Sequence, residues 1–171
     1  YHIPTAKYET FTEMDKALAY IDEQGAPIVV KADGLALGKG VVVASTVDEA
    51  KTAVREMMED HKFGQSGSTV VIEECMVGPE VTVLAFCDGE HLVPMLSSQD
   101  HKRAYDGNLG PNTGGMGAFC PSPKYTPEIA KECMEKIFLP TVAALKAEGR
   151  PFKGVIYFGL MLTKDGPKVV E

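Results

Sequence analysis

The stretch Ile28-Val-Val-Lys31-Ala-Asp-Gly34-Leu-Ala-Leu-Gly38-Lys39-Gly40-Val-Val-Val43 places three glycines and two lysines between two β-branched runs. Glycine lets a backbone approach a phosphate closely, and lysine supplies the countercharge, so the stretch predicts a phosphate-binding loop. It does not fit the Walker A pattern, which needs one more residue between the glycines and a helix after the loop. A loop between two strands favours a flap laid over phosphates. The alternative is a hairpin loop whose glycines only serve the turn.

Composition and charge exclude several classes of function. The chain has 171 residues, a net charge of −7 and an isoelectric point near 5.1, which argues against a general binder of nucleic acids or anionic membranes. The sequence shows neither an apolar run long enough to span a membrane nor a signal-peptide pattern. An anionic substrate would therefore need a local cluster of basic residues.

The four cysteines, Cys75, Cys87, Cys120 and Cys133, form no C-x-x-C pair. Three of them lie in apolar stretches, which indicates reduced thiols of a cytoplasmic protein rather than disulfides or a zinc site.

Residues 1–74 predict a small α+β lobe. After a short lead-in, we expect a helix capped by Thr12 and running to about Gln24, with Gly25 as its stop. Strands should flank the glycine loop, and Thr46 with Glu49 forms a capping box that opens a second helix. The expected apolar stripes of the two helices are Met14, Ala17, Leu18 and Ile21, and Ala50, Ala53, Val54 and Met57. Residues 70–74 predict a further strand.

Residues 75–171 predict a second, larger lobe after a hinge-like connection at residues 75–79. We expect a hairpin of strands 80–87 and 91–96, and a helix from Thr126-Pro127 to Gly149 with a kink or break at Pro140. A strand at 154–163 and a final run at 168–171 follow. Since the chain stops within a strand pattern, we expect it to be a piece of a longer protein.

Residues 97–123 show little periodicity, and a loop of that length is usually functional or disordered. The loop contains Gln99-Asp100-His101-Lys102-Arg103, and a His-Lys-Arg triplet in an acidic protein predicts a local anion site. Glycines at residues 110–117 free backbone amides for ligand contact. The alternative is a solvent-exposed basic patch on a flexible loop. His101 lacks a partner at metal-ligand spacing.

Acidic residues flank the connection between the two lobes. Glu73, Glu74 and Glu80 lie around a turn whose backbone groups could hold an adenine while a carboxylate takes the ribose hydroxyls; the alternative is a solvent-facing acidic edge. Glu171, at a strand end, could hold Mg²⁺, which prefers a carboxylate together with phosphate oxygens.

Taken together and in order, five segments resemble the phosphoribosylamine–glycine ligase family, also called the glycinamide ribonucleotide synthetases. The segments are residues 31–40, Val71-Ile-Glu-Glu74, Ser98-Gln-Asp-His-Lys-Arg103, Gly110-Pro-Asn-Thr-Gly-Gly-Met-Gly-Ala118 and Gly166-Pro-Lys-Val-Val-Glu171. The third and fourth are specific to this family, whereas the glycine loop alone indicates only the wider ATP-grasp superfamily. The resemblance covers essentially the whole chain.

The resemblance implies an ATP-grasp fold of class α+β, with two α+β lobes and the nucleotide bound between them. The family joins glycine to 5-phosphoribosylamine through a glycyl phosphate, with ATP going to ADP and phosphate, in purine biosynthesis. The cofactors it implies are ATP and Mg²⁺, with Mn²⁺ as an alternative ion. The partners are these small molecules, without nucleic acid or membrane, and the sequence leaves the oligomeric state undetermined.

By the same resemblance, individual residues receive roles. Lys31, Lys39 and Arg103 are the expected catalytic residues. The expected ATP-binding residues are Lys31, Gly38, Lys39, Gly40, Glu73, Glu74, Cys75, Met76, Val77, Glu80 and Met161. Among them, Lys31 would contact the α- and β-phosphates, residues 74–77 would hold the adenine, Met161 would pack against it, and Glu80 would hold the ribose. The expected substrate-binding residues are Asp100, His101, Lys102, Arg103, Asn112, Thr113, Gly114, Gly115 and Met116. Glu171 is the expected metal ligand.

The chain departs from the family pattern in two respects. The family normally continues after Glu171 with segments that supply a second metal ligand and an arginine, and Leu37 stands where alanine is more usual. Two alternatives follow: the isolated chain binds ATP without turnover, or it belongs to another ATP-grasp carboxylate–amine ligase. The second should lack the two specific segments.

Overall fold

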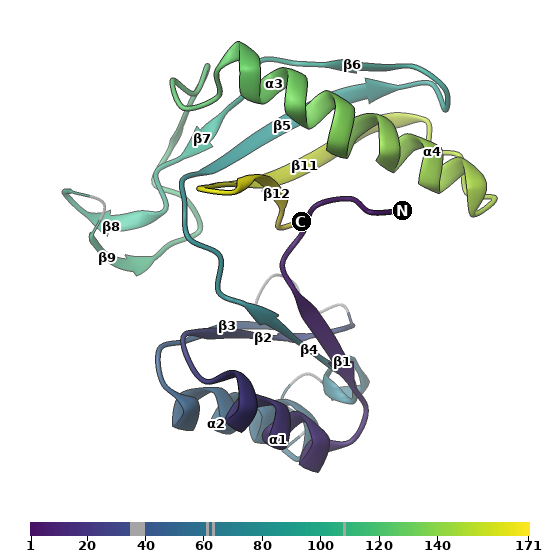
Figure 1. Cartoon of the computed structure of the whole chain (residues 1–171). Helices are drawn as coiled ribbons and strands as arrows, with labels where there is room; N and C mark the ends of the chain where they lie inside the picture. Colours follow the sequence, from purple (N-terminus) through teal and green to yellow (C-terminus); the bar gives the residue numbers. More distant parts are fainter. Residues whose placement is uncertain (35–39, 61, 63, 108) are drawn as a thin grey trace. The chain divides into compact units, whose positions relative to one another are not determined.

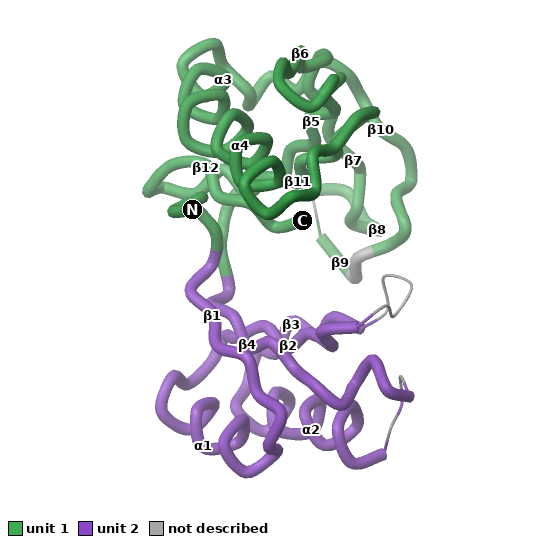
Figure 2. Tube along the Cα trace, turned by 90° about the vertical axis from the view of Figure 1, so that its right-hand side faces the viewer, with its two compact units in different colours: residues 1–5, 76–171 green, residues 6–75 purple. Residues whose placement is uncertain are grey.

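A computed structural model of the chain describes residues 1–34, 40–60, 62, 64–107 and 109–171. The chain divides into two compact units (Figure 2). Unit 2 comprises Ala6–Cys75, and unit 1 comprises Tyr1–Thr5 with Met76–Glu171. We predicted from the sequence that residues 1–74 form the first lobe, which includes residues 1–5. In the structure, Thr5 instead forms a parallel bridge with Val169 of unit 1.

Unit 2 is an antiparallel sheet of four strands in the order β1-β4-β2-β3, with both helices on one face (Figure 1). Its elements are β1 (Tyr8–Phe11), α1 (Met14–Gln24), β2 (Ile28–Ala32), β3 (Val41–Ala44), α2 (Val47–Met58), a 3₁₀ turn (Gly64–Gly67) and β4 (Val70–Glu74).

The helix-facing side of this sheet forms the core of unit 2. Alternate strand residues, among them Val30, Val70 and Ile72, are fully buried against the predicted helix stripes. Those stripes contain Ala17 and Ile21 on α1 and four buried residues on α2. The core of this unit therefore forms where the buried side chains of the strands, which recur every second residue, pack on those of the helices, which recur about every 3.6 residues.

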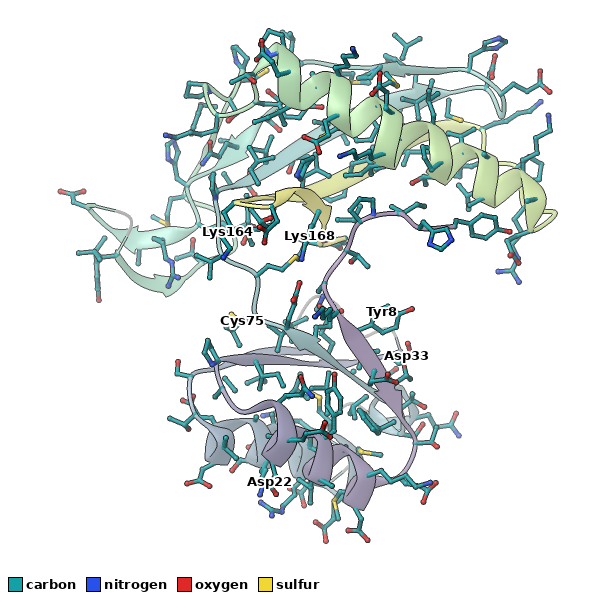
Figure 3. All side chains as sticks on the ribbon, in the orientation of Figure 1. Tyr8, Asp22, Asp33, Cys75, Lys164 and Lys168 are labelled. Atoms are coloured by element: carbon teal, nitrogen blue, oxygen red, sulfur yellow. The ribbon has the colours of Figure 1, made fainter. Side chains whose placement is uncertain are left out.

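The ends of the two helices differ in how well the sequence predicted them. Thr46 caps α2, since its hydroxyl accepts a hydrogen bond from the Glu49 N–H at 3.2 Å, and Gly25 ends α1 with φ at +77°. The prediction that Thr12 caps α1 was wrong. Glu13 occupies that position and makes no side-chain cap bond. In Figure 3, Asp22 marks α1, where it forms an ion pair with Lys51 of α2 at 2.6 Å.

Unit 1 is an antiparallel sheet of four strands in the order β12-β11-β5-β6, with α3 and α4 along one face (Figure 1). Its elements are β5 (Glu80–Cys87), β6 (Leu92–Pro94), β7 (Gln99–Asp100), β8 (Arg103–Tyr105), β9 (Leu109–Asn112), β10 (Ala118–Phe119), α3 (Pro127–Cys133), α4 (Leu139–Ala147), β11 (Gly154–Thr163) and β12 (Gly166–Val169).

Residues 97–123, for which the sequence predicts a long loop, contain two short antiparallel ribbons. Strand β7 pairs with β10, and β8 pairs with β9. Strand pairs of two to four residues carry too few alternating positions to be recognised from a periodic pattern.

The helix over the unit 1 sheet contains a π-helical segment, Met134–Phe138, between α3 and α4. The Leu139 N–H donates to the Met134 carbonyl, five residues back. Pro140 lacks an N–H and its ring would crowd the carbonyl four residues back, so the helix widens just before it. The predicted disturbance at Pro140 thus takes the form of a wide turn. Ile137 and Phe138 are fully buried there. The ring of Phe138 stacks on that of Phe158 of β11, with 4.2 Å between the ring centroids.

Among the described residues, we find no helix that combines the length and apolarity needed to traverse a lipid bilayer.

All four cysteines are free thiols. Burial raises the pKa of the Cys133 thiol to about 11 in spite of its hydrogen bond with Tyr125. This thiol is therefore protonated at neutral pH.

One face of the unit 2 sheet is buried and the other is exposed, so the same substitution should destabilise the two faces to different extents. Val30→Ala removes a fully buried side chain, whereas Val43→Ala removes one that is 58% exposed on the neighbouring strand. We expect Val30→Ala to lower the free energy of unfolding by roughly 2–3 kcal/mol, measured by urea denaturation. Because both variants lose the same strand propensity, Val43→Ala is the matched control. Equal losses in the two variants would contradict the assignment of the buried face.

Candidate functional site

The open face of the unit 2 sheet carries an ion pair between two neighbouring strands. The Lys31 Nζ atom of β2 lies 2.7 Å from Glu73 Oε2 of β4, and both side chains are about one-fifth exposed, at 22% and 18%. Val29 faces Glu73 in the register, so Lys31 and Glu73 are diagonal neighbours on one face. The fold thus brings together one expected phosphate ligand and one expected nucleotide contact.

The glycine loop leaves β2 next to this pair. The Ala32 N–H donates to the Gly40 carbonyl at 2.8 Å, and the Gly34 N–H donates to the Ser66 carbonyl of the 3₁₀ turn at 3.1 Å. A Cβ at Gly34 would approach Ser66 to 2.6 Å, so this position requires glycine. The predicted ligands Gly38 and Lys39, and also Leu37, lie outside the described residues.

Residues 75–79 connect β4 to β5 and contain the predicted adenine contacts. Cys75, labelled in Figure 3 at the end of β4, and Met76 are half-buried, and Val77 is 79% exposed. The following Gly78 is packed so tightly that a Cβ would lie 2.2 Å from the Leu162 carbonyl oxygen. The Leu162 N–H also donates to the Pro79 carbonyl at 3.0 Å, which fixes the start of β5 on β11.

The open face of the unit 1 sheet presents the side chains that follow this connection. Along β5, Val81 and Val83 enter the core, so Glu80 and Thr82 face the other way. Met161 of β11 is the direct partner of Glu80 in the register, which places the predicted adenine-packing residue beside the predicted ribose ligand. The hydroxyls of Thr82 and Tyr157 share a hydrogen bond of 3.2 Å on the same face.

A pocket of about 470 Å³ lies within unit 1 at this end of the sheet. It is lined by Gly78, Pro79, Glu80, Thr82, Gln99, Asp100, His101, Lys102, Arg103, Phe119 and Lys124. The predicted ribose ligand and the predicted anion-binding segment therefore share one cavity, although they are distant in the sequence.

Lys102 and Glu80 form an ion pair inside this pocket, and the two side chains are 39% and 43% exposed. Partial burial opposes the charge on Lys102, but its hydrogen bond to Glu80 and the negative charges of Glu80 and Asp100 outweigh burial and raise its pKa. Lys102 is therefore a permanent cation at neutral pH.

Residues 100–103 and 112–117 are locked to each other. The Lys102 carbonyl accepts hydrogen bonds from the Thr113 N–H at 2.7 Å and from its hydroxyl at 2.9 Å. The His101 carbonyl accepts from the Met116 N–H at 3.0 Å, and the His101 ring lies 5.1 Å from that of Phe119. The two family-specific segments thus form one surface in the structure.

Arg103 lies at the edge of this surface. Its Nη1 donates to the Gly110 carbonyl at 2.7 Å, and the side chain remains exposed. The backbone of Asn112 pairs with Arg103 in the β8–β9 ribbon. Gly114 and Gly115 are exposed, and a Cβ at Gly114 would meet open space.

Glu171 lies beside the open face. Its carbonyl accepts a hydrogen bond from the Gly159 N–H at 2.8 Å, and the residue lines a small cavity of about 30 Å³ together with Glu80 and Lys102. Within the described parts of the chain, we find no group of three or more His, Cys, Asp or Glu residues placed to hold a metal ion. A single carboxylate is still compatible with Mg²⁺, which often takes its other ligands from phosphates and water.

Sequence reasoning missed several residues of this site. Thr82, Tyr157, Phe119 and Lys124 line its cavities without having been singled out, and Gln99 was part of a family-specific segment but received no role of its own. Alternation along the two long strands could have indicated Thr82 and Tyr157, since polar residues there stand opposite apolar core positions. Phe119 and Lys124 belong to segments without a periodic signal.

Solved structures give the class of fold. The chain aligns over 99% of its length with 36% of a biotin carboxylase from Campylobacter jejuni in complex with a βγ-ATP ligand, at a TM-score of 0.74 and 16% identity. It also aligns over 99% of its length with 43% of a phosphoribosylamine–glycine ligase from Thermotoga maritima, at a TM-score of 0.83 and 32% identity. The class is therefore the ATP-grasp fold, as the sequence predicted.

The family follows from sequence comparison. Residues 1–171 match the family described as phosphoribosylglycinamide synthetase, ATP-grasp (A) domain, and the chain belongs to this family. A curated phosphoribosylamine–glycine ligase from Streptococcus pyogenes serotype M1 is 57% identical over 171 residues, which are 100% of this chain and 41% of that protein. The chain thus spans about two-fifths of the length of the curated relatives that it matches.

The packing of Gly78 predicts a local sensitivity to a single methyl group. Gly78→Ala places a Cβ against the Leu162 carbonyl and must displace the start of β5, whereas Gly114→Ala adds the same group in open space. We expect Gly78→Ala to lower the free energy of unfolding by about 1–3 kcal/mol, and Gly114→Ala to leave it nearly unchanged, in urea denaturation. If Gly78→Ala were as stable as the unmodified chain, the close approach to β11 would be wrong.

Proposed function

We propose that the protein containing this chain is a ligase that joins glycine to 5-phosphoribosylamine and converts ATP to ADP and phosphate. The observation that carries the proposal is the 57% identity to a phosphoribosylamine–glycine ligase over every residue of this chain. In the first step, a glycine carboxylate oxygen attacks the γ-phosphorus and ADP leaves. In the second, the sugar amine attacks the acyl carbon, phosphate leaves and the amine loses a proton.

The proposed ATP contacts follow the roles that the resemblance gives to individual residues. Residues 6–75 form the lid lobe, in which Lys31 contacts the α- and β-phosphates and Lys39, with Gly38 and Gly40, closes over the terminal phosphates. The backbone at residues 74–77 holds the adenine, Met161 packs against it, and Glu80 accepts hydrogen bonds from the ribose hydroxyls. Support comes from the placement of Met161 beside Glu80 and of Lys31 on an open sheet face.

The proposed metal is Mg²⁺, or Mn²⁺ as a substitute. Glu171 would hold it, with the remaining ligands supplied by phosphate oxygens and water. The bound ion would neutralise charge on the transferring phosphate.

The surface formed by residues 100–103 and 112–116 holds the substrates and the transferring phosphate in this proposal. Phosphoryl transfer and acyl transfer depend mainly on positioning and charge neutralisation, and neither requires a covalent protein intermediate. The mutual backbone bonds of the two segments supply a rigid platform, and the exposed Arg103 supplies positive charge.

A second candidate concerns the 171 residues alone. Each unit has its own buried core, while the chain spans only 41% of its relative, so the isolated chain could bind ATP without turnover. Titration with ATP and Mg²⁺, followed by an assay of glycine-dependent ADP release, separates the two. The protein at its natural length should release ADP only with glycine and 5-phosphoribosylamine present. Equal release when D-alanine replaces glycine would favour another carboxylate–amine ligase.

Lys31→Ala should weaken ATP binding by on the order of 1.5–3 kcal/mol, because a charge-assisted contact to phosphate is lost. Isothermal titration calorimetry provides the measurement. Lys16→Ala is the control, since it removes the same charge from an exposed ion pair on α1. An unchanged affinity in Lys31→Ala would remove this residue from the nucleotide site.

Arg103→Ala, made in the protein at its natural length, should depress turnover more than it weakens ATP binding, because the proposed partner of Arg103 is the transferring phosphate. Steady-state kinetics and nucleotide titration are compared in the same preparation. Arg103→Lys keeps the charge and should recover part of the rate. If both quantities fell by the same factor, the segment would belong to the nucleotide site instead.

A further inference from the structure

We propose that Lys102 acts as a positioning residue for Glu80, and that the pair determines the preference of the site for nucleotides with free ribose hydroxyls. The inference rests on the proposed function, in which Glu80 receives the ribose. It changes the role that the sequence suggested for Lys102, which was contact with substrates and the transferring phosphate.

The first argument is the engagement of the ammonium group. Lys102 Nζ donates to Glu80 Oε2, and both groups line the same pocket. Because the salt bridge uses Oε2, the other carboxylate oxygen, Oε1, can accept the hydrogen bonds of the ribose. The adjacent hydroxyls of a ribose can donate two such bonds, and hydrogen bonds to a charged acceptor are stronger than neutral ones.

The second argument is that both backbones are fixed. The Lys102 carbonyl accepts two hydrogen bonds from Thr113, and Glu80 begins a strand that is held to β11 through Pro79 and Leu162. Only side-chain torsions remain, so the ion pair sets the orientation of the Glu80 carboxylate. A carboxylate held in one orientation loses less conformational entropy when the nucleotide binds.

The third argument is the persistence of the charge. Because the carboxylates of Glu80 and Asp100 favour the protonated ammonium, Lys102 keeps its charge at neutral pH. Arg103 directs its guanidinium to the Gly110 carbonyl and does not take part in this pair. The neighbouring cations Lys102 and Arg103 therefore bind different partners, the Glu80 carboxylate and the Gly110 carbonyl.

The test compares ATP with 2′,3′-dideoxy-ATP, which lacks both ribose hydroxyls, as ligands of the protein at its natural length. Dissociation constants with Mg²⁺ and without glycine are measured by calorimetry for the unmodified protein and for Lys102→Met, Lys102→Arg and Glu80→Gln. The unmodified protein should prefer ATP by about tenfold or more. Lys102→Met and Glu80→Gln should lose most of this preference, with less than about a twofold change for the dideoxy nucleotide. Lys102→Arg should retain it.

Two further variants sharpen the result. Lys124→Met removes another cation from the wall of the same pocket and should affect both nucleotides equally. The double variant of Lys102→Met and Glu80→Gln should discriminate no worse than Glu80→Gln alone, because the two residues act as one unit.

The outcomes separate the inference from the function on which it rests. If Lys102→Met weakened the binding of both nucleotides by the same factor, Lys102 would contact the phosphates and the inference would be overturned, while the proposed ATP-dependent function would stand. Unchanged discrimination in Lys102→Met would overturn it as well. If the unmodified protein bound neither nucleotide, the proposed function would fail together with the inference.

Discussion

The antiparallel ladder between β5 and β11 is the constraint on which the pocket of unit 1 depends. It pairs Glu80 through Cys87 with Met161 back to Gly154, and it begins where Gly78 lies against the Leu162 carbonyl. One face of the ladder is filled by Val81, Val83 and the aromatic pair of Phe138 and Phe158. Since strand residues alternate, burial of that face directs Glu80 and Thr82 to the other. The core thus sets the orientation of the polar site.

Most of the regular structure could be predicted from local patterns. The bounds expected for the strands at residues 70–74, 80–87 and 154–163 agree with β4, β5 and β11. The predicted helix stripes contain the buried residues Ile21 and Met57. Such elements are defined within one short window of sequence, where β-branched runs, caps and glycine stops agree with one another.

The remainder depends on contacts between distant residues. Strand β1 was missed because Tyr8–Phe11 is an edge strand whose exposed residues give a weak pattern, and it is stabilised by β4, far along the chain. The order of residues 97–123 likewise comes from pairings such as Thr113 with Lys102. At the site, family motifs supplied the candidate residues, but local patterns could not reveal that Lys102 meets Glu80. That contact exists only once β5 and the loop have folded together.

The bridge between Thr5 and Val169 has a consequence for how the chain is assembled. Unit 2 is an insertion within unit 1, because the chain leaves unit 1 after residue 5 and returns to it at residue 76. All of unit 2 is synthesised as one block before most of unit 1 exists, so it can fold on the ribosome. Closing Thr5 onto Val169 joins residues 164 positions apart. A compact unit 2 shortens the effective loop and lowers the entropy cost of that closure.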